Sequence, residues 1–228
     1  MKYRLMTPEI ETQITEIRRK IRLSMNGIVS DQMIRNGITY KNNYGVSIPR
    51  IKEIARNYQQ NHDLAQNLWN LQIRETMILA TMLEPVDKFT RTNANEYVTY
   101  FNQIEIVEQT CMNLFCKLSY ANTLCQEWIQ SENQWFQITG YILAARIVEK
   151  LNSDEIKHII NIALKASETT EFHLYKAVAL CLSRFCRKDI KTATYIQNEI
   201  NVFTNTTISG QKYIYEEVKQ ELLFLNIL

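Results

Sequence analysis

Two carboxylates three residues apart are the first candidates for chemistry in this sequence. Glu105 and Glu108 lie in the stretch FNQIEIVEQ, residues 101–109, where helical spacing places both on one face. A pair of acids can stabilise developing positive charge or transfer protons in an enzyme. The same spacing also fits a solvated i, i+3 pair on an ordinary helix, and the surroundings have to distinguish the two.

Basic residues are the second candidates, because they gather in three clusters along the chain. The clusters are Arg18, Arg19, Lys20 and Arg22; Arg50, Lys52 and Arg56; and Arg184, Arg187, Lys188 and Lys191. The net charge is only +2, so binding of nucleic acid requires the clusters to lie on one face of the molecule. Each cluster alone also fits a solvated helix face.

Motifs of the common enzyme classes are absent from the sequence. There is no G-x-G-x-x-G or Walker A loop and no G-x-S-x-G elbow. His62, His158 and His173 are far apart in the chain, and none pairs with a cysteine at metal-ligand spacing. We therefore expect no metal, no cofactor, and neither a common hydrolase nor a nucleotide-binding enzyme.

The cysteines indicate a reducing compartment. The chain has five, an odd number, and most lie among apolar residues with helical spacing. The start, MKYRLMTPEIETQ, carries charges early and lacks the apolar segment of a secretory signal, and no apolar run reaches about 18 residues. We expect buried, reduced thiols in a cytoplasmic protein without a membrane span.

Helices must position these residues, because the sequence favours an all-α fold. The chain has 228 residues with 46% apolar content, enough for one domain, and its five Gly and three Pro are too few for a turn-rich β architecture. Thr7-Pro8-Glu9 predicts a capped helix that runs to about Met25. Further helices are expected near 30–35, after Ser47, and near 62–71, 73–83, 91–101, 104–118, 120–130, 133–150, 153–166, 170–186, 188–203 and 210–225.

A repeat of 36 residues organises the second half of the chain. The segment SENQWF begins at Ser131 and SETTEF begins at Ser167, and apolar positions on both sides match at the same offset. In both copies a polar turn joins two amphipathic helices. Helix pairs with this period are typical of an α-α superhelix of the HEAT or armadillo type, whose extended concave surface binds peptides, proteins or nucleic acid.

Three stretches resemble the DNA alkylation repair glycosylases of the AlkD type. They are YGVSIPRIKEIARNY, LWNLQIRETMILATML and WIQSENQWFQITGYIL, which supply Gly45, Val46 and Pro49, then Leu68-Trp69 with Arg74-Glu75, then a polar turn followed by an aromatic residue. The resemblance covers roughly residues 44–187. It implies one HEAT-like repeat domain over 1–228, with N-terminal helices in 1–36 and a C-terminal helical cap in 188–228.

The resemblance also implies a function and a site. Members are C-shaped, hold duplex DNA in the concave groove, and remove cationic 3- or 7-alkylpurines. A carboxylate near the sugar stabilises the oxocarbenium-like charge as the base departs. By alignment Glu108 takes the place of that carboxylate and Glu105 of the acid before it, whereas Ile104 and Leu180 stand where the family has tryptophans and Ile138 where it has an arginine.

The sequence therefore leaves two functions open. The first is a DNA alkylation repair-type protein that binds duplex DNA, with Glu108 and Glu105 as the catalytic candidates. Its candidate contacts to DNA are Arg50, Lys52, Arg56, Arg184, Arg187 and Lys188. The second is a HEAT-repeat scaffold without enzymatic activity that holds a protein partner in the same groove. Binding of DNA should weaken steeply with salt, whereas a peptide groove should be apolar or mixed in charge.

Overall fold

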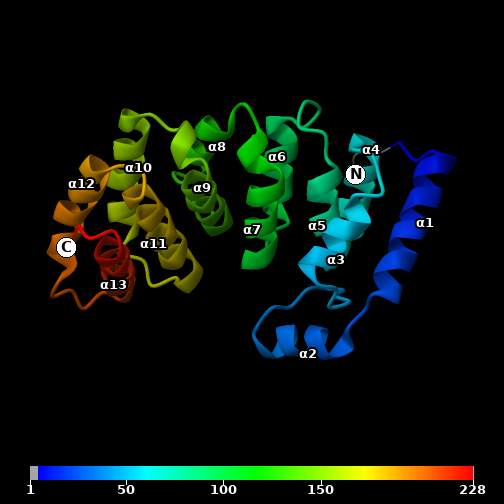
Figure 1. Ribbon diagram of the computed structural model, residues 1–228, viewed down its shortest axis with the longest axis horizontal. Helices are drawn as coiled ribbons and strands as arrows, with labels where there is room; N and C mark the ends of the chain where they lie inside the picture. Colours follow the sequence, from blue (N-terminus) through cyan, green and yellow to red (C-terminus); the bar gives the residue numbers. More distant parts are fainter. Residues whose placement is uncertain (1–4, 228) are drawn as a thin grey trace. The chain divides into compact units, whose positions relative to one another are not determined.

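The computed structural model describes residues 5–227, which fold almost entirely as helices (Figure 1). The α-helices among them are α1 Pro8–Leu23, α2 Gly27–Arg35, α3 Ile48–Ala55, α4 His62–Asn70, α5 Arg74–Leu83, α6 Arg91–Thr99, α7 Ile104–Asn113, α8 Ala121–Trp128, α9 Gln134–Arg146, α10 Ser153–Ala166, α11 Phe172–Cys186, α12 Ile190–Ile200 and α13 Ser209–Phe224. Three short 3-10 helices accompany them: η1 Phe115–Lys117, η2 Val148–Lys150 and η3 Asn201–Phe203. The described range contains no strand, and its isolated bridge joins Asn42 to Ile73. The all-α prediction is confirmed.

The chain divides into two compact units, one ending at Leu114 and the other beginning at Phe115. The first unit contains α1 to α7, and the second contains α8 to α13.

The first helix follows its sequence signals closely. Thr7 caps α1 by accepting a hydrogen bond from the backbone N–H of Ile10 at 3.3 Å, and Pro8 opens the helix. Four isoleucines at spacings of three and four residues form its buried stripe: Ile10, Ile14, Ile17 and Ile21. The helix ends at Leu23, two residues before the predicted end.

Three of the predicted helices end earlier than expected and continue as 3-10 turns. The predicted 104–118 helix stops at Asn113, because Leu114 leaves helical backbone with φ −127° and ψ −64°. The predicted 133–150 helix stops at Arg146, and 188–203 runs only over Ile190–Ile200 before η3. Apolar spacing continued across these breaks, which is why periodicity alone did not detect them.

The first unit has an aromatic core beneath α4 and α5, which pack side by side. The Trp69 ring stacks on Tyr97 of α6 with centroids 3.7 Å apart, and Phe101 meets the Trp69 edge at 6.1 Å. Gln66 links the same helices by donating to Tyr97 Oη at 3.1 Å and to Glu84 at 2.8 Å. Trp69 is therefore a core residue, as the apolar face of its helix predicts.

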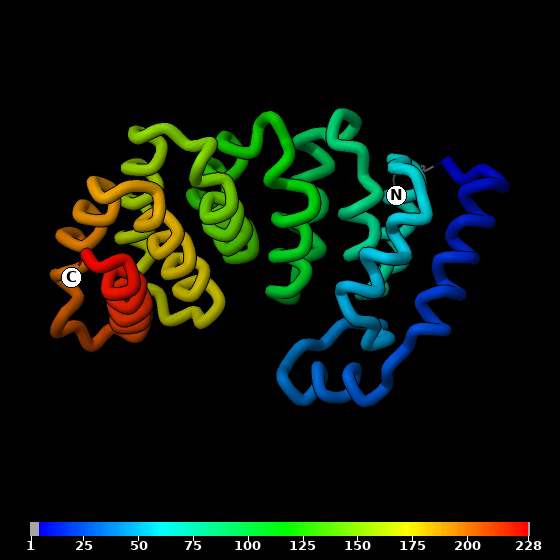
Figure 2. Tube along the Cα trace, in the orientation of Figure 1, coloured from blue at the N-terminus to red at the C-terminus, as the bar shows by residue number. Residues whose placement is uncertain are grey.

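The second unit is built on α9, α11 and α13. The tube in Figure 2 shows α11, in yellow, beside α13, in red, and the two pack along their lengths. Gly210 makes this close approach possible, because a Cβ there would lie 2.4 Å from the carbonyl oxygen of Thr169. Trp128, on α8, is buried against Phe115.

The repeat is confirmed at the level of helix pairs. SENQWF lies at the turn between α8 and α9, and SETTEF at the turn between α10 and α11. The register differs in detail, because Phe136 is the third residue of α9, whereas Phe172 is the first residue of α11.

Candidate nucleic-acid interface

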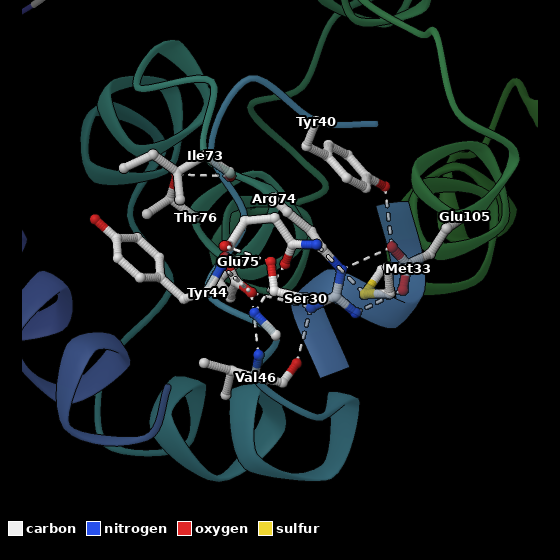
Figure 3. A network of polar contacts seen from close by, with 12 residues as sticks. Ser30, Met33, Tyr40, Tyr44, Val46, Ile73, Arg74, Glu75, Thr76 and Glu105 are labelled. Atoms are coloured by element: carbon white, nitrogen blue, oxygen red, sulfur yellow. Dashed lines mark hydrogen bonds and ion pairs between the residues drawn. The ribbon is translucent and has the colours of Figure 1, made fainter. Parts of the chain in front are cut away.

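Arg74, at the start of α5, is the centre of a buried network of charges in the first unit (Figure 3). Its Nη2 donates to Glu105 Oε1 at 2.6 Å, and its Nε donates to Glu105 Oε2 at 2.7 Å. Tyr40 donates to the same carboxylate at 3.0 Å. This arrangement is the planar two-bond pairing of a guanidinium with a carboxylate, which fixes geometry as well as charge.

Glu75, the next residue on α5, accepts hydrogen bonds from the loop before α3. The backbone N–H groups of Tyr44 and Val46 both donate to Glu75 Oε1 at 3.1 Å, and Arg74 Nη1 donates to this oxygen at 3.0 Å. A second bond of Arg74 Nη1 reaches the carbonyl of Val46 at 2.8 Å. We call Tyr40, Arg74, Glu75 and Glu105 the Arg74 network. Through it, the Arg74-Glu75 pair of the family motif ties the loop around Gly45 to α5 and α7.

The electrostatics of the Arg74 network favour the ionised form of Arg74. Burial lowers the pKa of Arg74, but the hydrogen bonds and charge of Glu105 outweigh it and raise that pKa above its ordinary value. Burial, together with the Glu105 carboxylate, raises the pKa of Tyr40, so its hydroxyl stays protonated as a donor. Glu105 also lies in the first turn of α7, where the helix dipole favours a negative charge.

The structure separates the roles of the two predicted carboxylates. Glu105 is only 19% exposed in its side chain and is bound by Arg74, so the solvated-pair interpretation is wrong for this residue. Both of its oxygens are used within the protein. Glu108, one turn further along α7, is exposed. Ile104 beside it is half-buried, and Ile138 is fully buried in α9.

The predicted cations of the first unit lie on the neighbouring helices α1 and α3. Arg50, Lys52 and Arg56 are all exposed on or just after α3. Arg50 donates to Ser24 Oγ, at the end of α1, at 3.0 Å and also pairs with Glu53 at 2.7 Å. The α1 cluster surrounds a surface hollow of about 250 Å³ lined by Thr15, Arg18, Arg19, Arg22 and Leu23. The bond to Ser24 ties Arg50 to the end of α1, the helix that carries the other basic cluster of this unit.

The predicted cations of the second unit have three different environments. Arg184 is exposed on α11. Arg187 is exposed but forms a two-bond pair with Glu221 of α13, with distances of 2.6 and 2.8 Å. Lys188 donates to the carbonyl oxygens of Val148 and Leu151 at 2.9 and 2.7 Å. Its ammonium therefore holds the turn at η2, which makes it the least available of the three for phosphate.

A groove of about 430 Å³ lies between α11 and α13, and we call it the α11–α13 groove. It is lined by Lys176, Ala179, Leu180, Ser183, Arg184, Arg187, Tyr213, Glu217, Gln220 and Glu221. Since Glu221 neutralises Arg187, the cations left to attract an anion are Lys176 and Arg184, opposed by Glu217. Leu180, at the position aligned with a family tryptophan, is 37% exposed in this groove.

Sequence reasoning weighed Trp135 as a stacking surface against a packing role, and it missed the other aromatic side chains beside this groove. Together with Trp135 they are His173, Phe172, Tyr175 and Tyr213, and we call the whole set the aromatic row. Successive ring centroids are 6.3, 5.3, 5.7 and 5.1 Å apart. Lys176 Nζ lies 4.3 Å from the centre of the Phe172 ring and 5.6 Å from that of Tyr213. The available signal was the spacing of Phe172 and Lys176, four residues apart on one helix.

No group of three or more His, Cys, Asp or Glu side chains in residues 5–227 could hold a metal ion. None of the helices in this range combines the length and the apolar character that crossing a membrane would require.

Comparison with known proteins supports the sequence resemblance. A family model described as DNA alkylation repair enzyme matches residues 17–209. No curated protein matches the chain.

Two solved structures match this chain over most of its length. One is described as "A new family of proteins related to the HEAT-like repeat DNA glycosylases with affinity for branched DNA structures". It has a TM-score of 0.71 over 90% of this chain and 94% of that one, at 12% identity. The other is an engineered protein, whose match covers 96% of this chain and 95% of that one at 13% identity, with a TM-score of 0.40. The first likeness shows a shared HEAT-like helical fold. Since the family model spans most of the sequence, the chain belongs to the DNA alkylation repair enzyme family.

Proposed function

We propose that this protein binds DNA through its phosphate backbone. The observation that carries the proposal is the α11–α13 groove, where Lys176 and Arg184 are exposed beside the aromatic row. Exposed Lys and Arg bind phosphates without reading sequence, and aromatic faces nearby can contact sugars or bases. The exposed Arg50, Lys52 and Arg56 form a second basic surface, in the first unit.

Two comparisons support DNA as the ligand. The family to which the chain belongs acts in repair of alkylated DNA by its description. The solved structure with the shared fold belongs to proteins with affinity for branched DNA. The proposal therefore treats duplex DNA, including branched duplexes, as the partner.

Excision of alkylated bases is a separate question within this proposal. Glu105 is engaged by Arg74 and Tyr40, so we assign it a structural role. The remaining candidate is Glu108, which is exposed and lies next to Ile104 where the resemblance implies a tryptophan. A carboxylate in contact with water stabilises a cationic transition state far less than one in a dry site. We therefore propose that binding, and not excision, is the main function.

The test of binding compares a groove variant and a control variant with the wild type. Anisotropy of a labelled 25-base-pair duplex is measured for wild type, for Lys176→Gln with Arg184→Gln, and for Lys165→Gln, an exposed cation on α10 outside the groove. We expect the double variant to bind more weakly, and the slope of log K against log salt to fall in magnitude by about 2. The Lys165 control should bind as the wild type does. Equal binding by all three proteins would refute the assignment of the groove.

The test of excision uses methylated duplex DNA in the same preparations. Release of 7-methylguanine and 3-methyladenine is followed for the wild type and for Glu108→Gln. We expect no release by either protein. Release by the wild type that is lost in Glu108→Gln would instead make Glu108 the catalytic carboxylate.

A second candidate function is a scaffold for a protein partner. It is favoured by a groove of about 500 Å³ between α10 and α12, where Ile156 and Ile160 line the same hollow as Lys157, Asp189 and Tyr195. Such a mixture of apolar and oppositely charged groups suits a peptide better than a phosphate backbone. Absence of DNA binding in the assay above, at low salt, would leave this function as the better supported.

A further inference from the structure

The aromatic row carries an inference about which DNA is bound, and this inference rests on the proposed function. We propose that the row is a stacking platform for unpaired bases, so that the protein prefers DNA with single-stranded nucleotides over fully paired duplex. The row lies wholly within the second unit, near the starts of α9, α11 and α13.

The aromatic row is accessible to solvent. Phe172 is 51% exposed, and His173 and Lys176 beside it are also exposed. Trp135, Tyr175 and Tyr213 are half-buried, which leaves part of each ring accessible while its neighbours hold it in place. Rings held in this way lose little conformational freedom when a ligand stacks on them. A phenylalanine this exposed adds nothing to a core.

The rings of the row lie close to one another. Neighbouring centroids are 5.1 to 6.3 Å apart, and Phe172 meets His173 and Tyr175 edge-on with interplanar angles of 77° and 74°. These near-perpendicular neighbours hold the Phe172 ring in place. Lys176 Nζ lies 4.3 Å from the centre of that ring. Bases have π-faces of their own, and stacking on aromatic side chains is tolerant of sequence.

The positive charge beside the row favours nucleic acid over other flat ligands. Tyr213, a member of the row, also lines the α11–α13 groove, and so does Lys176, whose ammonium lies over the Phe172 and Tyr213 rings. The rings therefore continue into the surface with Arg184. A strand whose phosphates follow the groove would have its bases at the row. Paired bases in a duplex cannot reach it, because their faces are covered by their neighbours in the stack. Carboxylates border the row at Glu171, which accepts from Gln134 at 3.2 Å, and at Glu217 in the groove.

The binding experiment compares DNA probes that differ only in pairing. Affinity is measured at one salt concentration for a thymine 20-mer, a 20-base-pair duplex, the same duplex with a gap of five unpaired nucleotides, and a fully paired four-way junction. Phe172→Ala is compared with Phe224→Ala, a phenylalanine that is 76% exposed on α13 and does not line the groove.

The expected result is a preference that depends on Phe172. The gapped duplex and the 20-mer should bind at least fivefold more tightly than the intact duplex, and Phe172→Ala should remove that difference. Phe224→Ala should leave it unchanged. A circular dichroism spectrum equal to that of the wild type would show that each variant is folded.

Intrinsic fluorescence gives an independent readout. Trp69 and Trp128 are buried, and Trp135 is the accessible tryptophan. Binding of the 20-mer should quench the fluorescence of Trp135, and this quenching should be absent in Trp135→Phe. The intact duplex should quench the Trp135 fluorescence little.

Failure of the inference differs from failure of the proposed function. Equal, salt-sensitive binding of all four probes, with Phe172→Ala no weaker than Phe224→Ala, would overturn the stacking platform and leave DNA binding intact. Tighter binding of the paired junction than of the 20-mer and the gapped duplex would also overturn it. Absence of binding to every probe at low salt would overturn the proposed function itself.

Discussion

A single buried cation, Arg74, binds Glu105, one of the two carboxylates singled out from the sequence. Arg74 is almost fully buried and is satisfied by Glu75, Glu105 and the carbonyl of Val46. Removing ions from water costs several kcal/mol each, and that cost is offset only when every charge finds partners. Glu105 is therefore held in place by the charge of Arg74 and by the Tyr40 hydroxyl. This engagement is the reason why we propose a structural role for Glu105.

Some residues of the Arg74 network were recognised from the sequence, but their contacts were not. The Arg74-Glu75 pair was recognised as part of a family motif, and Glu105 as a candidate acid. That they bind each other was not predictable, because 31 residues separate Arg74 from Glu105 and only the packing of α5 on α7 brings them together. Tyr213 and Lys176 were missed for the same reason, since they meet through packing of α13 on α11.

The different roles of the two carboxylates predict different effects on stability. Glu105→Gln removes a charge that Arg74 needs, and we expect a loss of about 3 kcal/mol in the free energy of unfolding. Glu108→Gln alters an exposed residue and should cost less than about 1 kcal/mol. Urea unfolding followed by circular dichroism measures both. Similar losses for the two variants would show that Arg74 does not depend on Glu105.

At the scale of elements, helix starts were predicted better than helix ends. Starts carry local signals such as Thr7 with Pro8, and α1, α4, α6, α7 and α10 begin within a residue of their predicted positions. Ends such as that of α7 at Asn113 depend on how Leu114 packs into the core, where it is fully buried. Tertiary contacts of this kind leave no local pattern to read.

The turn before α3 is an element whose geometry depends on one residue. Gly45 has φ +66°, and a Cβ there would lie 2.2 Å from the carbonyl oxygen of Asn26. Gly37 has φ +81° with nothing within 4 Å of such a Cβ. We expect Gly37→Ala to cost about 1 kcal/mol through backbone strain alone and Gly45→Ala clearly more, because a clash with backbone is added. Thermal unfolding of the two variants gives the comparison, and equal losses would mean that the loop relaxes around the new methyl group.

At the scale of the whole molecule, the described thiols are distributed as expected for buried reduced cysteines. Cys111, Cys125, Cys181 and Cys186 are buried, and Cys116 is half-buried. Burial raises the pKa of Cys125 and of Cys186 to about 12. Nearby carboxylates add to the shift, because Glu155 faces Cys125 and Glu221 faces Cys186.

These thiols give a prediction about the intact fold. A thiol with a pKa of about 12 is only about 0.01% thiolate at pH 8, so it reacts with a disulfide reagent very slowly. We expect one fast-reacting thiol, Cys116, in the native protein and five after unfolding in guanidinium chloride. Cys116→Ser should abolish the fast phase. Two or more fast thiols in the native protein would show that α7, α8 or α11 opens readily.

The Arg74 network has a consequence for how sequences of this kind can change over time. Loss of Arg74 alone would strand two carboxylates, and loss of Glu105 alone would strand part of a guanidinium. Each single step is therefore costly, whereas replacement of all the charged members by apolar side chains of similar volume can be neutral. Positions 74, 75 and 105 should consequently be inherited as a set, kept together in some lineages and replaced together in others.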